Sequence, residues 1–296
     1  MPELLKDRVV TFLHSLQDEI TRSLESADGE ATFREDIWER PGGGGGRTRI
    51  LTHGGIFEKA GVNFSAVHGA SPTMLQKDEH PSTFFATGVS LVLHPSSPMI
   101  PTVHANFRYF EQSTGEAWFG GGLDLTPYYL VEEDARSFHS ELKKTCDKYS
   151  PDYYHRFKKW CDEYFYIKHR GETRGVGGLF FDRLGGKAPE LEKHFEFVKG
   201  TANSFLPAYL PIVQRHRDER YTDDQKQWQL LRHGRYVEFN LVYDKGTLFG
   251  LETNGRTESI LMSLPSTACW TYDYQPVPGS EEEKLIEILK QPRDWA

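Results

Sequence analysis

The sequence predicts an α+β fold, with a large, mostly antiparallel sheet flanked by helices in a single domain that covers residues 1–296. Alternating apolar and polar residues, the pattern of half-buried strands, occur in the first and last thirds of the chain. Apolar residues at helical spacing dominate the middle third. Strands at both ends with helices clustered between them favour an α+β fold over parallel βαβ units. No long linker divides the sequence into two domains.

The N-terminal third predicts a helix followed by two strands. Apolar residues at helical spacing over 3–26 predict an amphipathic helix, so residues 1–30 are interpreted as a packing segment. Strands are predicted over 33–38 and 47–51, separated by the glycine run Gly42–Gly46. Because this run lacks the lysine and hydroxyl residue of a P-loop, we interpret it as a mobile or close-packed substrate loop.

The stretch 88–127 predicts two or three adjacent strands on which polar residues share one face. A strand buried on both faces would be apolar throughout, so this polar face indicates a functional surface. Its residues on the first two strands are Ser90, His94, His104, Asn106 and Arg108. On the third strand, Gly120–Gly122 precede Asp124, which allows a bulky ligand to approach the backbone beside a carboxylate.

The middle third predicts helices and the last third predicts strands. The helices cover 132–149, 151–168 and 189–221, with a glycine-rich loop at 171–178. Pro207 and Pro211 are expected to kink or divide the last of these helices. Alternation then predicts three antiparallel strands joined by hairpin turns. These strands cover 235–243, 247–251 and 259–264, and a final helix covers 281–290.

Composition excludes several classes of protein. The net charge of -8, without a basic cluster that contains aromatics, argues against nucleic-acid binding. The mean hydropathy is -0.59, and no apolar run approaches the length of a transmembrane segment. The odd number of cysteines, Cys146, Cys161 and Cys269, indicates reduced thiols rather than a disulfide framework. Acidic residues near the N-terminus argue against a transit peptide, so a cytoplasmic protein is predicted.

The polar and glycine-rich motifs resemble those of the oxygen-dependent coproporphyrinogen III oxidases. The similarity continues in order, with similar spacing, over nearly the whole chain after about residue 30. The motifs that carry it are Ser90-Leu-Val-Leu-His94, His104-Ala-Asn-Phe-Arg108, Gly120-Gly-Gly-Leu-Asp124-Leu-Thr-Pro127 and His169-Arg-Gly-Glu-Thr-Arg174-Gly-Val-Gly-Gly178.

This resemblance implies an oxidoreductase of haem biosynthesis. Such an enzyme uses O2 as co-substrate and converts two propionate side chains of coproporphyrinogen III to vinyl groups. The products are protoporphyrinogen IX, two CO2 and two H2O2. The resemblance also implies a homodimer, with 236–271 as the expected dimer contact. No organic cofactor is expected, because the electron-rich pyrrole can itself react with O2 and no redox cofactor motif is evident.

Three residues are predicted to carry the chemistry. Asp124 is predicted to meet the pyrrole N–H groups, with a turn-capping carboxylate as the alternative. His104 is predicted to be a proton shuttle, with simple hydrogen bonding as the alternative. Arg108 is predicted to hold a propionate through its planar guanidinium, with a structural salt bridge as the alternative.

The resemblance also implies a set of substrate contacts. The predicted substrate-binding residues are Ser90, Asn106, Phe107, Arg108, Arg174, Asn254, Gly255 and Arg256. Four histidines match positions treated as divalent-metal ligands in some members of the family. They are His94, His104, His139 and His169. Because no pair has a short ligand spacing, acid–base and hydrogen-bonding roles are preferred to a required metal, and the metal content stays open.

Two other classes of protein remain as alternatives. A noncatalytic tetrapyrrole-binding protein would bind the substrate through arginines and aromatic residues without consuming O2. A histidine-ligated metalloenzyme of another reaction class would lose all activity when its metal is removed.

Overall fold

The computed structural model of this chain describes residues 3–71, 82–252 and 255–296. A seven-stranded sheet forms its centre, and neighbouring strands are antiparallel throughout. The strands are β1 (Arg34–Glu39), β2 (Gly44–Thr52), β3 (Phe57–Ala70), β4 (Thr83–Pro95), β5 (Thr102–Gln112), β6 (Ala117–Thr126) and β9 (Gly177–Gly185). They lie side by side in this order. A small second sheet pairs β7 (Tyr166–Ile167) with β8 (Glu172–Thr173).

Helices pack on both faces of the large sheet. They are α1 (Leu5–Asp28), α2 (Glu132–Cys146), α3 (Tyr153–Tyr164), α4 (Ala188–Asn203), α5 (Phe205–His216), α6 (Asp223–Val242), α7 (Lys245–Glu252), α8 (Thr257–Leu261) and α9 (Glu281–Lys290). The main core joins α1, α2, α4 and α5 to the apolar side chains of one sheet face, such as Leu91 and Phe107. Within the described ranges, no helix combines the length and apolarity needed to cross a membrane.

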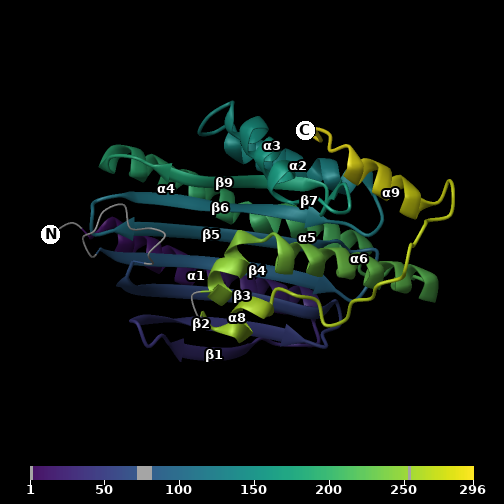
Figure 1. Cartoon of the computed structure of the whole chain (residues 1–296), viewed down its shortest axis with the longest axis horizontal. Helices are drawn as coiled ribbons and strands as arrows, with labels where there is room; N and C mark the ends of the chain where they lie inside the picture. The colour runs from purple at the N-terminus through teal and green to yellow at the C-terminus, as the bar shows by residue number, and fades with distance from the viewer. Residues whose placement is uncertain (1–2, 72–81, 253–254) are drawn as a thin grey trace.

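The other sheet face carries Asn106 and Arg108, and we call it the open face. Helices α6 and α8 cross in front of it at one end of the strands, whereas α1 lies behind the sheet (Figure 1). Gln229 of α6 donates through Nε2 to the carbonyl of Pro95 at the end of β4, at 2.9 Å. Asn63 of β3 donates to the carbonyl of Ser259 in α8, at 2.7 Å. These contacts fix a helical cover over part of the face and leave Arg108 partly exposed.

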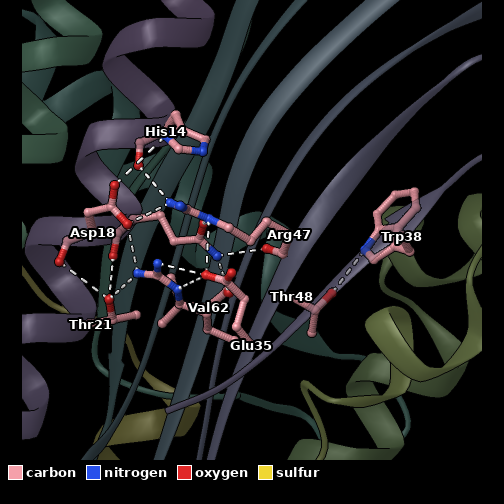
Figure 2. A network of polar contacts seen from close by, with 10 residues as sticks. His14, Asp18, Thr21, Glu35, Trp38, Arg47, Thr48 and Val62 are labelled. Carbon is pink, nitrogen blue, oxygen red and sulfur yellow. Dashed lines mark hydrogen bonds and ion pairs between the residues drawn. The ribbon is translucent and has the colours of Figure 1, made fainter. Parts of the chain in front are cut away.

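Helix α1 is held on the opposite face by the polar network in Figure 2. Arg47 and Arg49 of β2 both pair with Asp18 of α1, at 2.7 and 2.8 Å. Arg49 also pairs with Glu35 of β1 at 2.8 Å, and the Nε of Arg47 donates to Gln17 at 2.6 Å. The two arginines therefore tie the N-terminal helix to the sheet and do not face the open side.

The predicted α+β fold with an antiparallel sheet is confirmed. The predicted interruption at Gly42–Gly46 is confirmed for Gly42 and Gly43, which lie between β1 and β2. It is wrong for Gly44–Gly46, which begin β2 and pair with β3. The indole of Trp38 lies over Gly46, where an added Cβ would come within 2.3 Å of the ring. This part of the glycine run therefore makes room for an aromatic ring within the sheet.

The prediction of strands in the last third is wrong. Residues 235–242 belong to α6, 247–251 belong to α7, and 259–261 belong to α8. The fully buried side chains of α6 recur at helical spacing, as at Arg232, Tyr236 and Asn240. The alternation of apolar and polar residues over 235–243 was misleading. Helix α6 crosses the sheet, and its residues in this range are buried at helical spacing rather than at every second position.

A helix start signal precedes this region. The hydroxyl of Thr222 accepts from the backbone N–H of Gln225, and the Gln225 side chain accepts from the backbone N–H of Thr222. This capping box begins α6 and favours a helix that continues through 235–242.

No strand is predicted for β3 or β9, yet both belong to the sheet. The glycines at 177–178, interpreted as part of a loop, open β9 and pair with β6. The predicted helix at 189–221 is divided into α4 and α5 at Ser204, and the hairpin of β7 and β8 follows α3 where a longer helix is predicted.

Asp28 joins the end of α1 to the beginning of β3. Its buried carboxylate accepts from the backbone N–H groups of Ile56 and Phe57, at 2.9 and 3.0 Å, and of Ala31 at 3.0 Å. Burial alone would raise the pKa of Asp28, but these backbone donors outweigh burial and lower it. The Asp28 carboxylate thus accepts from backbone groups both near it and far from it in the sequence and joins the end of α1 to the beginning of β3.

We expect Asp28→Ala to lower the free energy of unfolding by roughly 3 kcal/mol, because several buried N–H groups lose their acceptor. Asp18→Ala removes a more exposed carboxylate and should cost about 1 kcal/mol or less. Urea unfolding followed by circular dichroism measures both values. Because the folded-state pKa of Asp28 is lowered, its contribution is complete above the unfolded pKa of about 4 and is lost as pH falls through the folded-state pKa. Equal destabilisation by the two variants would contradict this role.

Candidate active site

Antiparallel register gathers most of the predicted site residues on the open face. His104 of β5 lies opposite Asp124 of β6, and Asn106 lies opposite Ser90 of β4. Directly opposed residues point to the same side of a sheet, and alternation adds Arg108 to that side. The sheet therefore supplies an acid, a base and a cation in neighbouring positions.

His104 and Asp124 form a hydrogen-bonded pair that is open at one end. Nδ1 of His104 lies 2.8 Å from Oδ1 of Asp124. The Asp124 side chain is 2% exposed, whereas the His104 side chain is 21% exposed. Because the carboxylate accepts, Nδ1 is the donor of this bond, and in the neutral imidazole Nε2 is the acceptor. Nε2 of His104 has no hydrogen-bond partner among the described residues. The part of the pair that a ligand can reach is the histidine.

Arg174 holds Asp124 from the protein interior. Its Nη2 donates to both carboxylate oxygens of Asp124, at 3.0 and 2.8 Å, and its Nη1 donates to Asn240 of α6 at 2.9 Å. The guanidinium lies 4.0 Å from the ring centroid of Phe165 and 4.4 Å from that of Tyr236. Burial would raise the pKa of Asp124, but the charge of Arg174 and the bond from His104 outweigh it and lower the pKa.

Arg174 therefore occupies a different place from the one predicted. Its side chain is 3% exposed and engaged by Asp124 and Asn240, so it supports the carboxylate instead of reaching the open face. Asp124 is likewise almost fully buried, with 2% of its side chain exposed. The accessible end of this hydrogen-bonded chain is His104.

Arg108 is an accessible cation on the open face. Its side chain is 38% exposed, and its Nη2 donates to Oδ1 of Asp182 in β9 at 2.9 Å. Its Nη1 donates to Oδ1 of Asn106 at 3.1 Å. Asp182 is not among the predicted site residues, although two adjacent charges at Asp182 and Arg183 interrupt an apolar run. That interruption was a sequence signal for a β-bulge.

Two of the predicted substrate-binding residues, Ser90 and Phe107, lie on opposite faces of the sheet. Ser90 is partly buried on the open face beside Asn106. The prediction that Phe107 contacts substrate is wrong for its side chain, which is fully buried in the core on the helix-packed face. Strand alternation requires this result, because Phe107 lies between Asn106 and Arg108.

The remaining predicted contacts lie near the β1 edge. Arg256 precedes α8, forms an ion pair with Asp36 of β1 and lies 6.0 Å from the ring centroid of Trp38. The backbone N–H of Gly255 donates to the carbonyl of Gly250 at 2.7 Å. Asn254 lies outside the described residues. The described part of this group belongs to the helical cover rather than to the pair formed by His104 and Asp124.

The four histidines considered as metal ligands do not converge. His94 bonds Thr102 and the Ser263 carbonyl, and burial holds its pKa well below the usual value. His139 lies in α2, on the other side of the sheet, with a pKa lowered by burial to about 3. His169 bonds Tyr243 and Glu238, and His104 bonds Asp124. Among the residues that the structure describes, no group of three or more acidic, histidine or cysteine side chains could hold a metal ion.

Comparisons with known proteins find similarity over nearly the whole chain. A family model described as coproporphyrinogen III oxidase matches residues 8–295. The chain is 51% identical to a soybean (Glycine max) protein named oxygen-dependent coproporphyrinogen-III oxidase, chloroplastic, over 98% of this chain and 80% of that protein. It is 50% identical to a Drosophila melanogaster protein named oxygen-dependent coproporphyrinogen-III oxidase, over 99% of this chain and 79% of that protein. An Arabidopsis thaliana protein named coproporphyrinogen-III oxidase 1, chloroplastic, is 49% identical over 98% of this chain and 79% of its own length.

A double-mutant cycle tests whether Asp124 and Arg174 act as one unit. We expect Asp124→Asn and Arg174→Met each to lower the free energy of unfolding by about 3–5 kcal/mol, because each leaves a buried charge without its partner. The double variant should lose at least about 1 kcal/mol less than the sum of the two losses. Urea unfolding of the four proteins provides the values. Additive losses would show that the two charges are not coupled.

Proposed function

The chain belongs to the coproporphyrinogen III oxidase family, and we propose that its open face binds the substrate and carries the reaction. The enzyme uses O2 to convert two propionate side chains of coproporphyrinogen III to vinyl groups, giving protoporphyrinogen IX in haem biosynthesis. The observation that supports this location is the pair of His104 and Asp124, which opens at Nε2 of His104 on the same face as accessible Arg108.

The proposed roles follow from exposure and bonding. Nε2 of His104 accepts a proton from the substrate, because it is the nitrogen of the ring that is not bonded to Asp124. Asp124 orients the ring and stabilises the imidazolium that forms, and Arg174 keeps Asp124 ionised. Arg108 binds a propionate, with Asn106 and Ser90 as neutral neighbours on the same face.

The proposed reaction balances with O2 as the only oxidant. Each propionate chain, R–CH2–CH2–COOH, reacts with one O2 to give R–CH=CH2, CO2 and H2O2. The two electrons that reduce O2 to peroxide come from the substrate, whose reduced pyrrole rings are electron-rich. The proposal therefore includes neither an organic cofactor nor a required metal.

We expect metal-stripped enzyme to form protoporphyrinogen IX from coproporphyrinogen III under air and none under nitrogen. His104→Ala should lower kcat by roughly 10²- to 10⁴-fold, the range of a lost general base. His155→Ala is the matched control, because His155 is exposed and pairs with Asp294 near the C-terminus. O2 uptake and the vinyl product are measured together.

Other outcomes identify the alternatives. Binding without O2 uptake would indicate a tetrapyrrole-binding protein. Turnover that returns only with added metal would indicate a metal-dependent enzyme, and an unchanged kcat for His104→Ala would exclude the proposed proton acceptor.

A homodimer that contacts through residues 236–271 is also part of the proposal. Exposed apolar side chains occur there at Leu241, Val242, Leu251 and Trp270, a composition typical of interface cores. Light scattering should give a mass of about twice the 34.0 kDa of one chain. Leu241→Arg with Val242→Arg should give monomers, whereas Ile37→Arg, at an exposed apolar position on β1, should not. A monomeric wild-type protein would contradict the proposal.

We also propose a cytoplasmic location. Cys146, Cys161 and Cys269 are free thiols in the structure, which suits a reducing compartment. Burial raises the pKa of the Cys146 thiol to about 12, so this residue is expected to be unreactive.

A further inference from the structure

A β-bulge places two adjacent charged residues on the open face. Gly121 pairs with Phe181 and Phe119 pairs with Leu184, so Asp182 and Arg183 together oppose the single residue Gly120. Phe181 and Leu184 are both buried in the helix-packed core. Without the extra residue, strict alternation would send Asp182 and Arg183 to opposite faces, with one charge toward the core.

The bulge is tightly built around Asp182 and Arg108. Arg183 has a φ of 51°, an uncommon backbone conformation for a residue other than glycine. Opposite it, an added Cβ at Gly120 would lie 2.5 Å from Oδ1 of Asp182 and 2.8 Å from Nε of Arg108. A glycine at this position lets the ion pair lie flat against the strand. Bulges and local backbone strain are concentrated beside functional sites, where they redirect a side chain.

Asp182 presents a carboxylate oxygen where a ligand can reach it. Its side chain is 31% exposed, and Oδ1 accepts from Arg108 at 2.9 Å. Oδ2 has no hydrogen-bond partner among the described residues. Asp124, by contrast, is 2% exposed and has both oxygens bonded to Arg174. Unlike Asp124, Asp182 therefore has an oxygen left to accept from a ligand.

A carboxylate would repel the anionic side chains of a propionate-bearing substrate unless it met a donor group. The reduced tetrapyrrole has such donors in its pyrrole N–H groups. A propionate chain is short, so the carboxylate that it carries lies close to the N–H of its own pyrrole ring. A cation and an anion that are neighbours on the protein can therefore bind the two groups together. The adjacent Arg108 and Asp182 match this arrangement of an anion beside a donor.

We propose that Oδ2 of Asp182 accepts hydrogen bonds from pyrrole N–H groups of the reduced tetrapyrrole while Arg108 binds a propionate. This inference rests on the proposed function and adds a contact that selects for the reduced ring. A porphyrinogen has four pyrrole N–H groups, whereas the oxidised porphyrin with the same side chains has two. Asp182 should therefore distinguish the two redox forms of the ring, and Arg108 should not.

The test compares two ligands that differ at the ring nitrogens and carry the same propionates. Dissociation constants for coproporphyrinogen III and coproporphyrin III are measured under nitrogen by quenching of tryptophan fluorescence. Asp182→Asn keeps an oxygen for Arg108 but removes the charge. We expect it to weaken porphyrinogen binding roughly tenfold and porphyrin binding less than about twofold, since a hydrogen bond to a charged group is lost for one ligand. Arg108→Lys should weaken both ligands by similar factors.

Two further variants keep the result interpretable. Asp182→Ser removes the charge with a smaller side chain and should reduce the preference for porphyrinogen in the same way. Glu35→Gln is the matched control, because Glu35 also pairs with an arginine of the sheet, but on the helix-packed face. It should leave both dissociation constants unchanged.

The inference is overturned if Asp182→Asn and Asp182→Ser leave the ratio of the two dissociation constants unchanged. This can happen in two ways: neither constant changes, or both rise by the same factor. The second result would mean that Asp182 only positions Arg108. Turnover of the wild-type protein under air is measured on the same preparation. Turnover together with an unchanged ratio removes only this inference, whereas a wild type that binds porphyrinogen without turnover removes the proposed function.

Discussion

The buried ion pair between Arg174 and Asp124 is the constraint on which the site depends. Two charges taken out of water are costly, and their attraction offsets that cost only when the geometry is close and the remaining donors are satisfied. Here Nη2 of Arg174 reaches both oxygens of Asp124, and Nη1 reaches Asn240. The buried Nε of Arg174 has no hydrogen-bond partner among the described residues, so the pair is closely placed but one donor is left unsatisfied. One pair thereby links β6, the segment after β8 and helix α6.

Helix α6 contributes to a second linked group at the surface of the same region. Glu238 bonds Arg170, His169 and Trp270. Burial would raise the pKa of Glu238, but the bonds from Arg170 and His169 outweigh it and lower the pKa to about 2. Asn240 and Glu238 thus attach the helix to the hairpin that precedes Arg174. The position of the Asp124 carboxylate is consequently set by an element far away in the sequence.

The sequence was most informative where local periodicity and tertiary structure agree. Alternation in β5 correctly placed His104, Asn106 and Arg108 on one face, because an antiparallel sheet buried on the other face enforces it. The same reasoning failed at 235–242, where burial against the end of the sheet follows a helical stripe.

The details of the site could not be read from residue types alone. The partners of Arg174 depend on tertiary packing, which turns a predicted substrate contact into a support for Asp124. Alternation from core-facing Phe181 puts Asp182 on the open face, but the bulge that keeps Arg183 out of the core changes the pairing of β9 with β6. The four histidines considered as metal ligands each bond different partners, and most of these partners come from distant parts of the sequence. Spacing can suggest such groups but cannot give their distances.

The most direct measurement is a crystal structure of the enzyme with coproporphyrinogen III, prepared and frozen without O2. The account predicts a tetrapyrrole on the open face, with a propionate bonded to Arg108, Nε2 of His104 directed at the ligand, and Asp124 still enclosed by Arg174. A tetrapyrrole bound elsewhere, or an Asp124 carboxylate that leaves Arg174 to contact the ring nitrogens, would contradict it.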